Sequence, residues 1–124
     1  MNRVWVAIAD DDEIFRSSFA QYLRGLQEIV VMAEADSGQA AIELVKLHRP
    51  DVLLMDCSLS GLDGYEATRV IASKFPETKV IILTMGDSQE HREKAARAGA
   101  AGSIIKGTRH PEMVRTIQST MLAV

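Results

Sequence analysis

The chain has 124 residues, 47% of them hydrophobic and 25% charged, and these values are typical of one globular domain, expected here over residues 1–124. Its net charge of −3 and dispersed basic residues predict no direct binding of nucleic acid, and its single cysteine excludes a disulfide framework or a thiolate metal site. Neither a signal peptide nor an apolar run of the roughly 18 residues that span a membrane is found, so we expect a cytoplasmic protein.

Five short apolar segments alternate with five segments of helical spacing. The apolar segments, read as strands, cover residues 4–9, 29–33, 52–56, 80–84 and 103–105. The first, the third and the fourth are unbroken apolar runs rather than alternating ones, which is typical of strands buried on both faces of a parallel sheet. The third strand is the clearest, because four apolar residues stand between Asp51 and Asp56.

Three of the helical segments have a stripe of apolar residues that we expect to face inward. These residues are Phe15, Phe19, Tyr22, Leu23 and Leu26 after an Asp12 cap, Ala41, Leu44 and Val45 after a Ser37 cap, and Val114, Ile117 and Met121 after Pro111. A further helix is expected over 65–74. The remaining helix, over 87–98, has no large apolar residue. We expect it to dock weakly through Ala95, Ala96 and Ala98, to end at Gly99, and to be mobile.

This alternation predicts an α/β fold, a doubly wound (βα)5 domain with a parallel sheet, right-handed crossovers and helices on both faces. In such folds the ligand site lies outside the carboxyl ends of the strands. The residues at those ends are Asp10 and Asp11, Asp56, Thr84 and Lys106, whereas Asp36-Ser37 after the second strand is assigned to capping.

Three converging carboxylates repel one another, so at least one should have a raised pKa or the group should bind a cation. The donors are oxygens, with no histidine or thiolate among them, and this set favours Mg²⁺. Lys106 can pair with a phosphoryl oxygen and Thr84 can hydrogen-bond another, which indicates phosphoryl transfer to a carboxylate. Asp10 and Asp11 are adjacent and can share the cation, so Asp56, which stands opposite, is the expected nucleophile.

Several motifs together resemble the receiver domain of two-component response regulators, over the whole chain from Arg3 to Leu122. They are Ala9-Asp10-Asp11, the run from Pro50 to Asp56 that continues to Gly61-Leu62-Asp63-Gly64, Leu83-Thr84, and the stretch from Ala98 to Lys106. The last stretch, with Gly107, is similar to receivers that precede a helix-turn-helix DNA-binding domain.

The resemblance implies a flavodoxin-like strand order of 2-1-3-4-5 and a phosphorylation-activated switch. Asp56 would accept a phosphoryl group from a phosphohistidine of a sensor histidine kinase or phosphotransfer protein, and Asp10, Asp11, Asp56 and the Ser58 carbonyl would hold Mg²⁺. Thr84 would swing toward the phosphoryl group and Lys106 would pair with it.

The same resemblance implies that the surface of the fourth helix, fifth strand and fifth helix changes and controls a downstream protein or a C-terminal output domain. Such a chain is not an enzyme beyond its own aspartyl phosphorylation and dephosphorylation, and it has no membrane partner. A phosphorylation-dependent homodimer, and the choice between a stand-alone receiver and part of a longer regulator, stay open.

The sequence departs from the receiver pattern at three places. Ser103 stands where receivers usually carry the Tyr or Phe of a rotamer switch, Ser60 where a proline often follows the acceptor, and Gly107 where a proline often follows the lysine. Ser58 and Gly86 stand where receivers border the path of the attacking water, and the small Gly86 leaves that path open.

Three other functions compete with this interpretation. A hydrolytic phosphatase with an Asp nucleophile would need a general-acid Asp two residues later, where this chain has Ser58. Nucleotide binding is disfavoured because no glycine-rich loop follows the first strand. A degenerate receiver that serves as an unphosphorylated docking module remains the alternative, because Ser103 replaces the aromatic residue.

Overall fold

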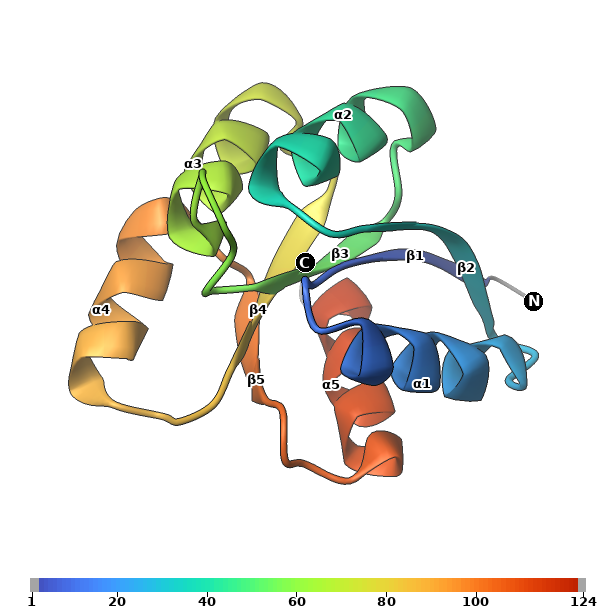
Figure 1. The fold of residues 1–124 in the computed structure, drawn as a ribbon. Helices are drawn as coiled ribbons and strands as arrows, with labels where there is room; N and C mark the ends of the chain where they lie inside the picture. Colours follow the sequence, from blue (N-terminus) through green and yellow to red (C-terminus); the bar gives the residue numbers. More distant parts are fainter. Residues whose placement is uncertain (1–2, 123–124) are drawn as a thin grey trace.

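The chain folds as a five-stranded sheet with helices on both sides (Figure 1). A computed structural model describes residues 3–122. Its strands are β1 (Val4–Ala9), β2 (Ile29–Ala35), β3 (Val52–Asp56), β4 (Lys79–Thr84) and β5 (Gly102–Ile105). Its helices are α1 (Glu13–Arg24), α2 (Gly38–His48), α3 (Gly64–Lys74), α4 (Gln89–Ala98) and α5 (His110–Leu122). None of these helices has the length and apolar character needed to cross a membrane.

Strand β3 lies at the centre of the sheet. The strand order is β2-β1-β3-β4-β5, and every neighbouring pair is parallel, as predicted. All five residues of β3 are buried, in agreement with its unbroken apolar run. The order reverses between β1 and β3, because β2 lies on one side of β1 and the rest of the chain continues on the other. In doubly wound folds the ligand site lies at such a reversal, which here is at the carboxyl ends of β1 and β3.

Side chains alternate between the two faces of the sheet and so build two cores. On one face, Leu54 belongs to a cluster that contains Phe19 of α1 and Ile117 of α5. On the other face, Met55 belongs to a cluster that contains Ile71 of α3 and residues of α2 and α4. Figure 1 shows the same division, with α1 and α5 on one side of the sheet and α2, α3 and α4 on the other.

Helix α4 has no large apolar residue on its buried face, and its anchor differs from the prediction. Its buried residues are His91, Ala95 and Ala98, whereas Ala96 is exposed, so the prediction that Ala96 docks the helix was wrong. The buried three follow the i, i+4, i+7 spacing of one helix face, and Ala96 lies off that face. The helix begins two residues later than predicted because the Ser88 side chain caps it, accepting from the backbone N–H of His91 at 3.1 Å.

Helix α5 packs on the sheet through its first two turns. Met113, Val114 and Ile117 are buried, while Met121 in the last turn is 37% exposed, so the inward placement of Met121 was wrong. Pro111 lies in the first turn as predicted, where its missing N–H leaves no helical bond unmade. The inward stripe therefore starts one residue before Val114 and ends one turn earlier than the sequence pattern predicted.

Candidate functional site

Residues that sequence reasoning selected stand at the carboxyl ends of four strands. Asp10 follows β1, Asp56 ends β3, Thr84 ends β4 and Lys106 follows β5. Asp11 is next to Asp10 in the turn between β1 and α1. The parallel strands bring these five residues to one edge of the sheet, at the reversal of strand order.

Helix caps fix the turns at this edge. Asp12 accepts from the backbone N–H of Phe15 at 3.1 Å and so begins α1, and Ser37 accepts from that of Ala40 at 3.1 Å and begins α2. Both caps were predicted. The backbone N–H of Asp12 also donates to Oδ1 of Asp10 at 2.9 Å. The start of α1 therefore orients the Asp10 carboxylate.

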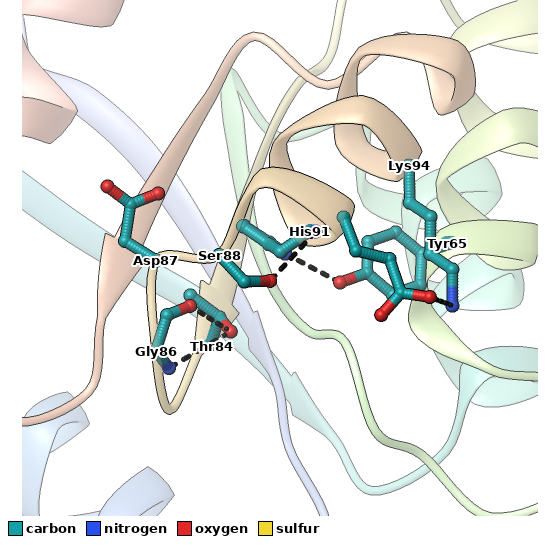
Figure 2. Close-up of a pocket in the computed structure, with 8 residues that line it drawn as sticks. Tyr65, Thr84, Gly86, Asp87, Ser88, His91 and Lys94 are labelled. Carbon is teal, nitrogen blue, oxygen red and sulfur yellow. Dashed lines mark hydrogen bonds and ion pairs between the residues drawn. The ribbon is translucent and has the colours of Figure 1, made fainter.

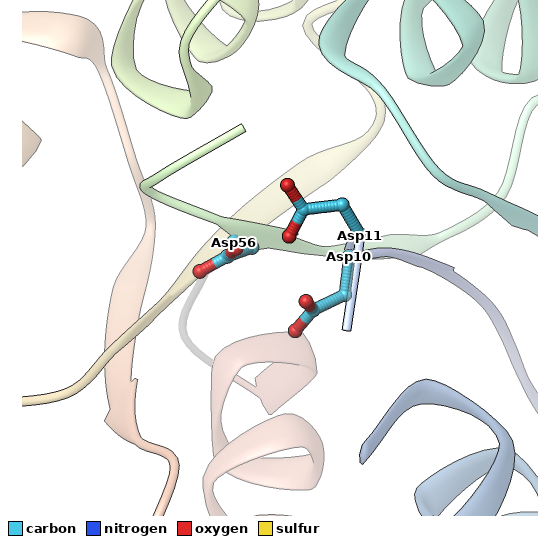
Figure 3. A group of neighbouring side chains, drawn as sticks. All are labelled: Asp10, Asp11 and Asp56. Carbon is cyan, nitrogen blue, oxygen red and sulfur yellow. The ribbon is translucent and has the colours of Figure 1, made fainter. Parts of the chain in front are cut away.

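Asp10, Asp11 and Asp56 form an acidic cluster (Figure 3). One carboxylate oxygen from each lies within 4.8 Å of one from each of the others. Asp10 and Asp56 are buried, at 0% and 5% exposure, whereas Asp11 is exposed. The acidic cluster is thus largely buried at the carboxyl ends of β1 and β3, and it is exposed to solvent at Asp11.

The ammonium group of Lys106 bridges two members of the acidic cluster. Its Nζ lies 2.7 Å from Oδ2 of Asp10 and 3.4 Å from Oδ1 of Asp56, and 5.0 Å from the ring centroid of Phe15. Burial alone would lower the pKa of Lys106, but the close contact and charge of Asp10, together with those of Asp56, raise it above its usual value. Lys106 therefore stays protonated beside the acids.

Asp56 is the acid with the clearest electrostatic perturbation. Its pKa rises from 3.8 to about 6, first because of burial and second because of the negative charge of Asp10. The charge of Lys106 and the backbone N–H of Ser58 oppose the rise without cancelling it. The prediction that at least one clustered carboxylate has a raised pKa is therefore confirmed.

The donors of the acidic cluster fit a hard divalent cation. They are carboxylate oxygens, which Mg²⁺ prefers. Oδ2 of Asp10 is buried and, among residues 3–122, has no hydrogen bond of good geometry, so its contact with Lys106 is an ion pair. A cation here would offset the negative charge of Asp10, which after burial is the second cause of the raised pKa of Asp56.

The loop after Asp56 folds back closely on the end of β3. The backbone N–H of Gly64 donates to the Cys57 carbonyl oxygen at 3.2 Å. A Cβ atom on Gly64 would lie 2.0 Å from the carbonyl oxygen of Asp56, so only glycine permits this approach. The backbone N–H of Ser58 lowers the pKa of Asp56, while a metal-binding role for the Ser58 carbonyl stays a prediction.

Thr84 is hydrogen-bonded to its own loop (Figure 2). Its Oγ1 donates to the carbonyl oxygen of Gly86 at 2.9 Å. The buried Thr84 lines a pocket of about 510 Å³, together with Tyr65 of α3 and His91 and Lys94 of α4. The threonine hydroxyl thus lies between the end of β4 and the start of α4.

Arg16 supports the acidic cluster and was missed by sequence reasoning. Its Nη1 donates to the backbone carbonyl of Asp10 at 2.6 Å, and its Nε pairs with Glu34 of β2 at 3.1 Å. The signal that could have found it is Glu34, the single charged residue of β2, which needs a partner at the sheet edge. Arg16 therefore ties the turn that carries Asp10 to the neighbouring strand.

His91 was also missed. It is 5% exposed, and its ring nitrogens lie 2.5 Å from Oη of Tyr65 and 2.7 Å from Oγ of Ser103. Its spacing from Ala95 and Ala98, on the one buried face of α4, was the available signal.

Comparisons with known proteins relate this fold and site to a family. The family model described as the response regulator receiver domain matches residues 6–118. YxjL of Bacillus subtilis (strain 168), described as an uncharacterized transcriptional regulatory protein, is 36% identical over 118 residues, which are 95% of this chain and 54% of that protein. The oxygen regulatory protein NreC of Staphylococcus aureus (strain JH9) is 39% identical over 115 residues, 92% of this chain and 53% of that protein. The chain thus spans about half the length of these curated relatives.

A solved structure agrees with these sequence matches. The signal receiver domain of the response regulator NarL from Mycobacterium tuberculosis superimposes with a TM-score of 0.94 and 31% identity, over the full length of both chains.

Proposed function

We propose, since this chain belongs to the response regulator receiver domain family, that it is a signalling switch operated by phosphorylation of Asp56. Response regulators are signalling proteins and not metabolic enzymes. The proposal treats residues 1–124 as one receiver unit that catalyses only its own aspartyl phosphorylation and dephosphorylation. Its main support is the contact of the Lys106 ammonium group with both Asp10 and Asp56, at the carboxyl ends of the strands.

The proposed reaction is an in-line transfer from a phosphohistidine on a sensor histidine kinase or phosphotransfer protein. One carboxylate oxygen of Asp56 attacks the phosphorus, an O–P bond forms, and the P–N bond breaks. The imidazole nitrogen leaves with the electron pair and is protonated from solvent. A pKa of about 6 keeps the Asp56 carboxylate mainly ionised at neutral pH, as the attack requires.

Lys106 and Thr84 would then hold the transferred group. Lys106 already lies 3.4 Å from an Asp56 oxygen, so a small displacement lets it pair with a phosphoryl oxygen. Thr84 must first exchange its bond to the Gly86 carbonyl for one to the phosphoryl group, which draws the β4–α4 loop with it.

The acidic cluster would hold Mg²⁺, which receiver domains typically bind. Asp10, Asp11 and Asp56 offer the carboxylates, and the Ser58 carbonyl would add a further oxygen. When bound, the ion supplies positive charge that offsets repulsion between the acids and the incoming phosphate.

The output of the switch would pass through the surface of α4, β5 and α5. Because the curated relatives named as transcriptional regulatory proteins are about twice as long, we propose a DNA-binding output domain, in a longer polypeptide or a separate partner, as the recipient. The net charge of −3 gives no reason to assign nucleic-acid binding to residues 1–124 themselves. A phosphorylation-dependent homodimer is a further route for the same output.

The test is to incubate the protein with a small acyl phosphate and Mg²⁺ and to weigh it by mass spectrometry. We expect one added phosphoryl group, which Asp56→Asn abolishes. The matched control is Asp36→Asn, because Asp36 is an exposed aspartate that follows β2 at the same edge and lies outside the acidic cluster.

Removal of the metal gives the second arm. A chelator should abolish the gain in mass, and modification that persists would remove the metal role of Asp10 and Asp11. Equal modification of the Asp56→Asn variant would refute the choice of nucleophile. No modification of the wild type with an acyl phosphate or a kinase would favour the unphosphorylated docking module instead.

A further inference from the structure

Helix α4 is anchored mainly by one polar side chain. Its two other buried residues, Ala95 and Ala98, contribute only methyl groups, whereas the imidazole of His91 is 5% exposed. A helix with so little buried apolar surface gains little from the hydrophobic effect. Its position over the sheet should therefore depend strongly on the contacts of His91.

His91 joins three elements through two hydrogen bonds. Its Nδ1 lies 2.5 Å from the hydroxyl of Tyr65 at the start of α3, and its Nε2 lies 2.7 Å from the hydroxyl of Ser103 in β5. A neutral imidazole has one donor and one acceptor, and each hydroxyl can take either role, so the three side chains satisfy one another. We call Tyr65, His91 and Ser103 the α4 latch.

Two further contacts hold the Tyr65 side of the latch. The ring centroids of Tyr65 and His91 are 5.7 Å apart, and the Lys94 ammonium group lies 5.6 Å from the Tyr65 ring centroid (Figure 2). Contacts of this kind favour one orientation of the tyrosine ring. These contacts therefore fix the position of the Tyr65 hydroxyl relative to His91.

The latch is connected to both parts of the phosphorylation site. Tyr65 directly follows Gly64, which packs against the carbonyl oxygen of Asp56. On the other side, the backbone N–H of His91 donates to the Ser88 cap at 3.1 Å, and Ser88 ends the short loop that Thr84 and Gly86 begin. Movement of the Thr84 loop therefore acts directly on the turn of α4 that carries His91.

We propose that His91 is a positioning residue whose latch holds α4 and the Thr84 loop in the arrangement in which Thr84 is bonded to Gly86. This inference rests on the proposed function, because it assigns the latch to the unphosphorylated state. For Thr84 to turn toward a phosphoryl group, its loop must release Gly86 and displace the cap at Ser88. The latch opposes that change, in a chain where Ser103 stands in place of the usual aromatic residue.

If the latch holds the unphosphorylated arrangement, variants that weaken it should bind a phosphoryl mimic more tightly. A general loss of stability would not have this effect. Removing a hydroxyl of the latch weakens only the unphosphorylated arrangement, so the population shifts toward the other one. Tyr65→Phe and Ser103→Ala should each bind beryllofluoride, a mimic of the phosphoryl group on Asp56, about five-fold more tightly in Mg²⁺, the factor that corresponds to one net hydrogen bond. The matched controls are Tyr22→Phe on α1 and Ser73→Ala on the exposed face of α3, which should not change this affinity.

Amide hydrogen exchange gives the second measurement. Without beryllofluoride, amides of residues 89–98 should exchange faster in both latch variants than in the controls, while those of β3 should not change. His91→Leu, which removes both bonds and keeps an apolar side chain in place, should show the largest effect of each kind.

The outcomes separate this proposal from the proposed function. Faster exchange with unchanged or weaker beryllofluoride affinity would make the latch an ordinary structural contact and overturn the proposal, and so would unchanged exchange in α4. If the wild type binds no beryllofluoride and takes up no acyl phosphate, the proposed function fails. The positioning role toward Thr84 then falls with it, while the exchange data still decide whether the latch holds α4.

Discussion

Lys106 is closer to Asp10 than to Asp56, with Nζ 2.7 Å from one carboxylate and 3.4 Å from the other. Asp10 is fully buried and the Lys106 side chain is 12% exposed, so this ion pair lies largely out of water. Lys106 therefore compensates Asp10 first. If Lys106 moves to a phosphoryl group, Asp10 needs another positive charge, and a cation in the acidic cluster would supply it.

Replacement of Lys106 should cost stability that Mg²⁺ restores. Lys106→Met leaves the buried Asp10 without its counter-ion, so the free energy of unfolding without metal should fall by about 3 kcal/mol. Urea denaturation at pH 7, with and without Mg²⁺, measures the effect. Lys74→Met, which removes an exposed lysine at the end of α3, is the control. An equal loss with and without Mg²⁺ would contradict the coupling.

The raised pKa of Asp56 predicts how stability depends on pH. Because the pKa is about 6 in the folded protein against 3.8 ordinarily, the folded state holds this proton more tightly than the unfolded state. The resulting stabilisation is complete below pH 3.8 and is lost as the pH rises through about 6. Asp56→Asn cannot ionise, so without metal it should be more stable than the wild type above pH 6.

Urea denaturation at a series of pH values from about 3.5 to about 8 tests this. The quantity to compare is the free energy of unfolding of Asp56→Asn minus that of the wild type. The difference should grow with pH across the window from 3.8 to about 6 and then level off. Added Mg²⁺ should reduce it. A difference that is constant with pH would show that Asp56 titrates normally.

Arg16 should control the affinity of the acidic cluster for metal. Arg16→Lys keeps the charge but cannot reach both the Asp10 carbonyl and Glu34 with a planar fork, so Mg²⁺ should bind about ten-fold more weakly. Titration of Mg²⁺ by calorimetry or by amide chemical shifts measures it. Arg24→Lys alters the more exposed partner of the same Glu34 and should leave the affinity unchanged. Equal weakening in both variants would contradict a specific role for the bond between Arg16 and the Asp10 carbonyl, because Arg24 shares only the contact with Glu34.

Gly64 should tolerate no side chain. In Gly64→Ala the new methyl group would meet the backbone carbonyl of Asp56, so α3 or the end of β3 must shift. We expect a loss of about 2 kcal/mol or more in urea denaturation, and slower acceptance of a phosphoryl group from an acyl phosphate. Gly107→Ala is the comparison, because a Cβ there meets nothing within 4 Å. A loss of similar size in Gly107→Ala would contradict the assignment of the Gly64 effect to this steric clash.

The sequence predicted the sheet well because its central strands are buried on both faces. The run from Val52 to Met55 could be read directly, and the rule for parallel strands placed Asp10 and Asp56 at one edge. The prediction ended β2 at Ala33, whereas the strand continues to Ala35. As an edge strand, β2 can include the polar Glu34, which breaks an apolar pattern without ending the strand.

Side-chain partners were predicted less well, because they depend on packing between distant elements. The strand ends did not indicate that Lys106 would be nearer to Asp10, or that Thr84 would be bonded to Gly86. His91 was missed for the same reason, since its partners on α3 and β5 are 26 and 12 residues away. Periodicity identifies the inward face of a helix, but it does not reveal which hydroxyl groups will meet there.

The narrow anchoring face of α4 has a consequence for evolution. Arg92, Glu93, Ala96 and Arg97 are exposed and lie off that face, so exchanging them removes no core packing. If α4 carries the proposed output, mutations there can alter which proteins recognise the helix while the scaffold keeps its stability. New recognition specificities could therefore arise by single substitutions, each of which leaves the protein well folded.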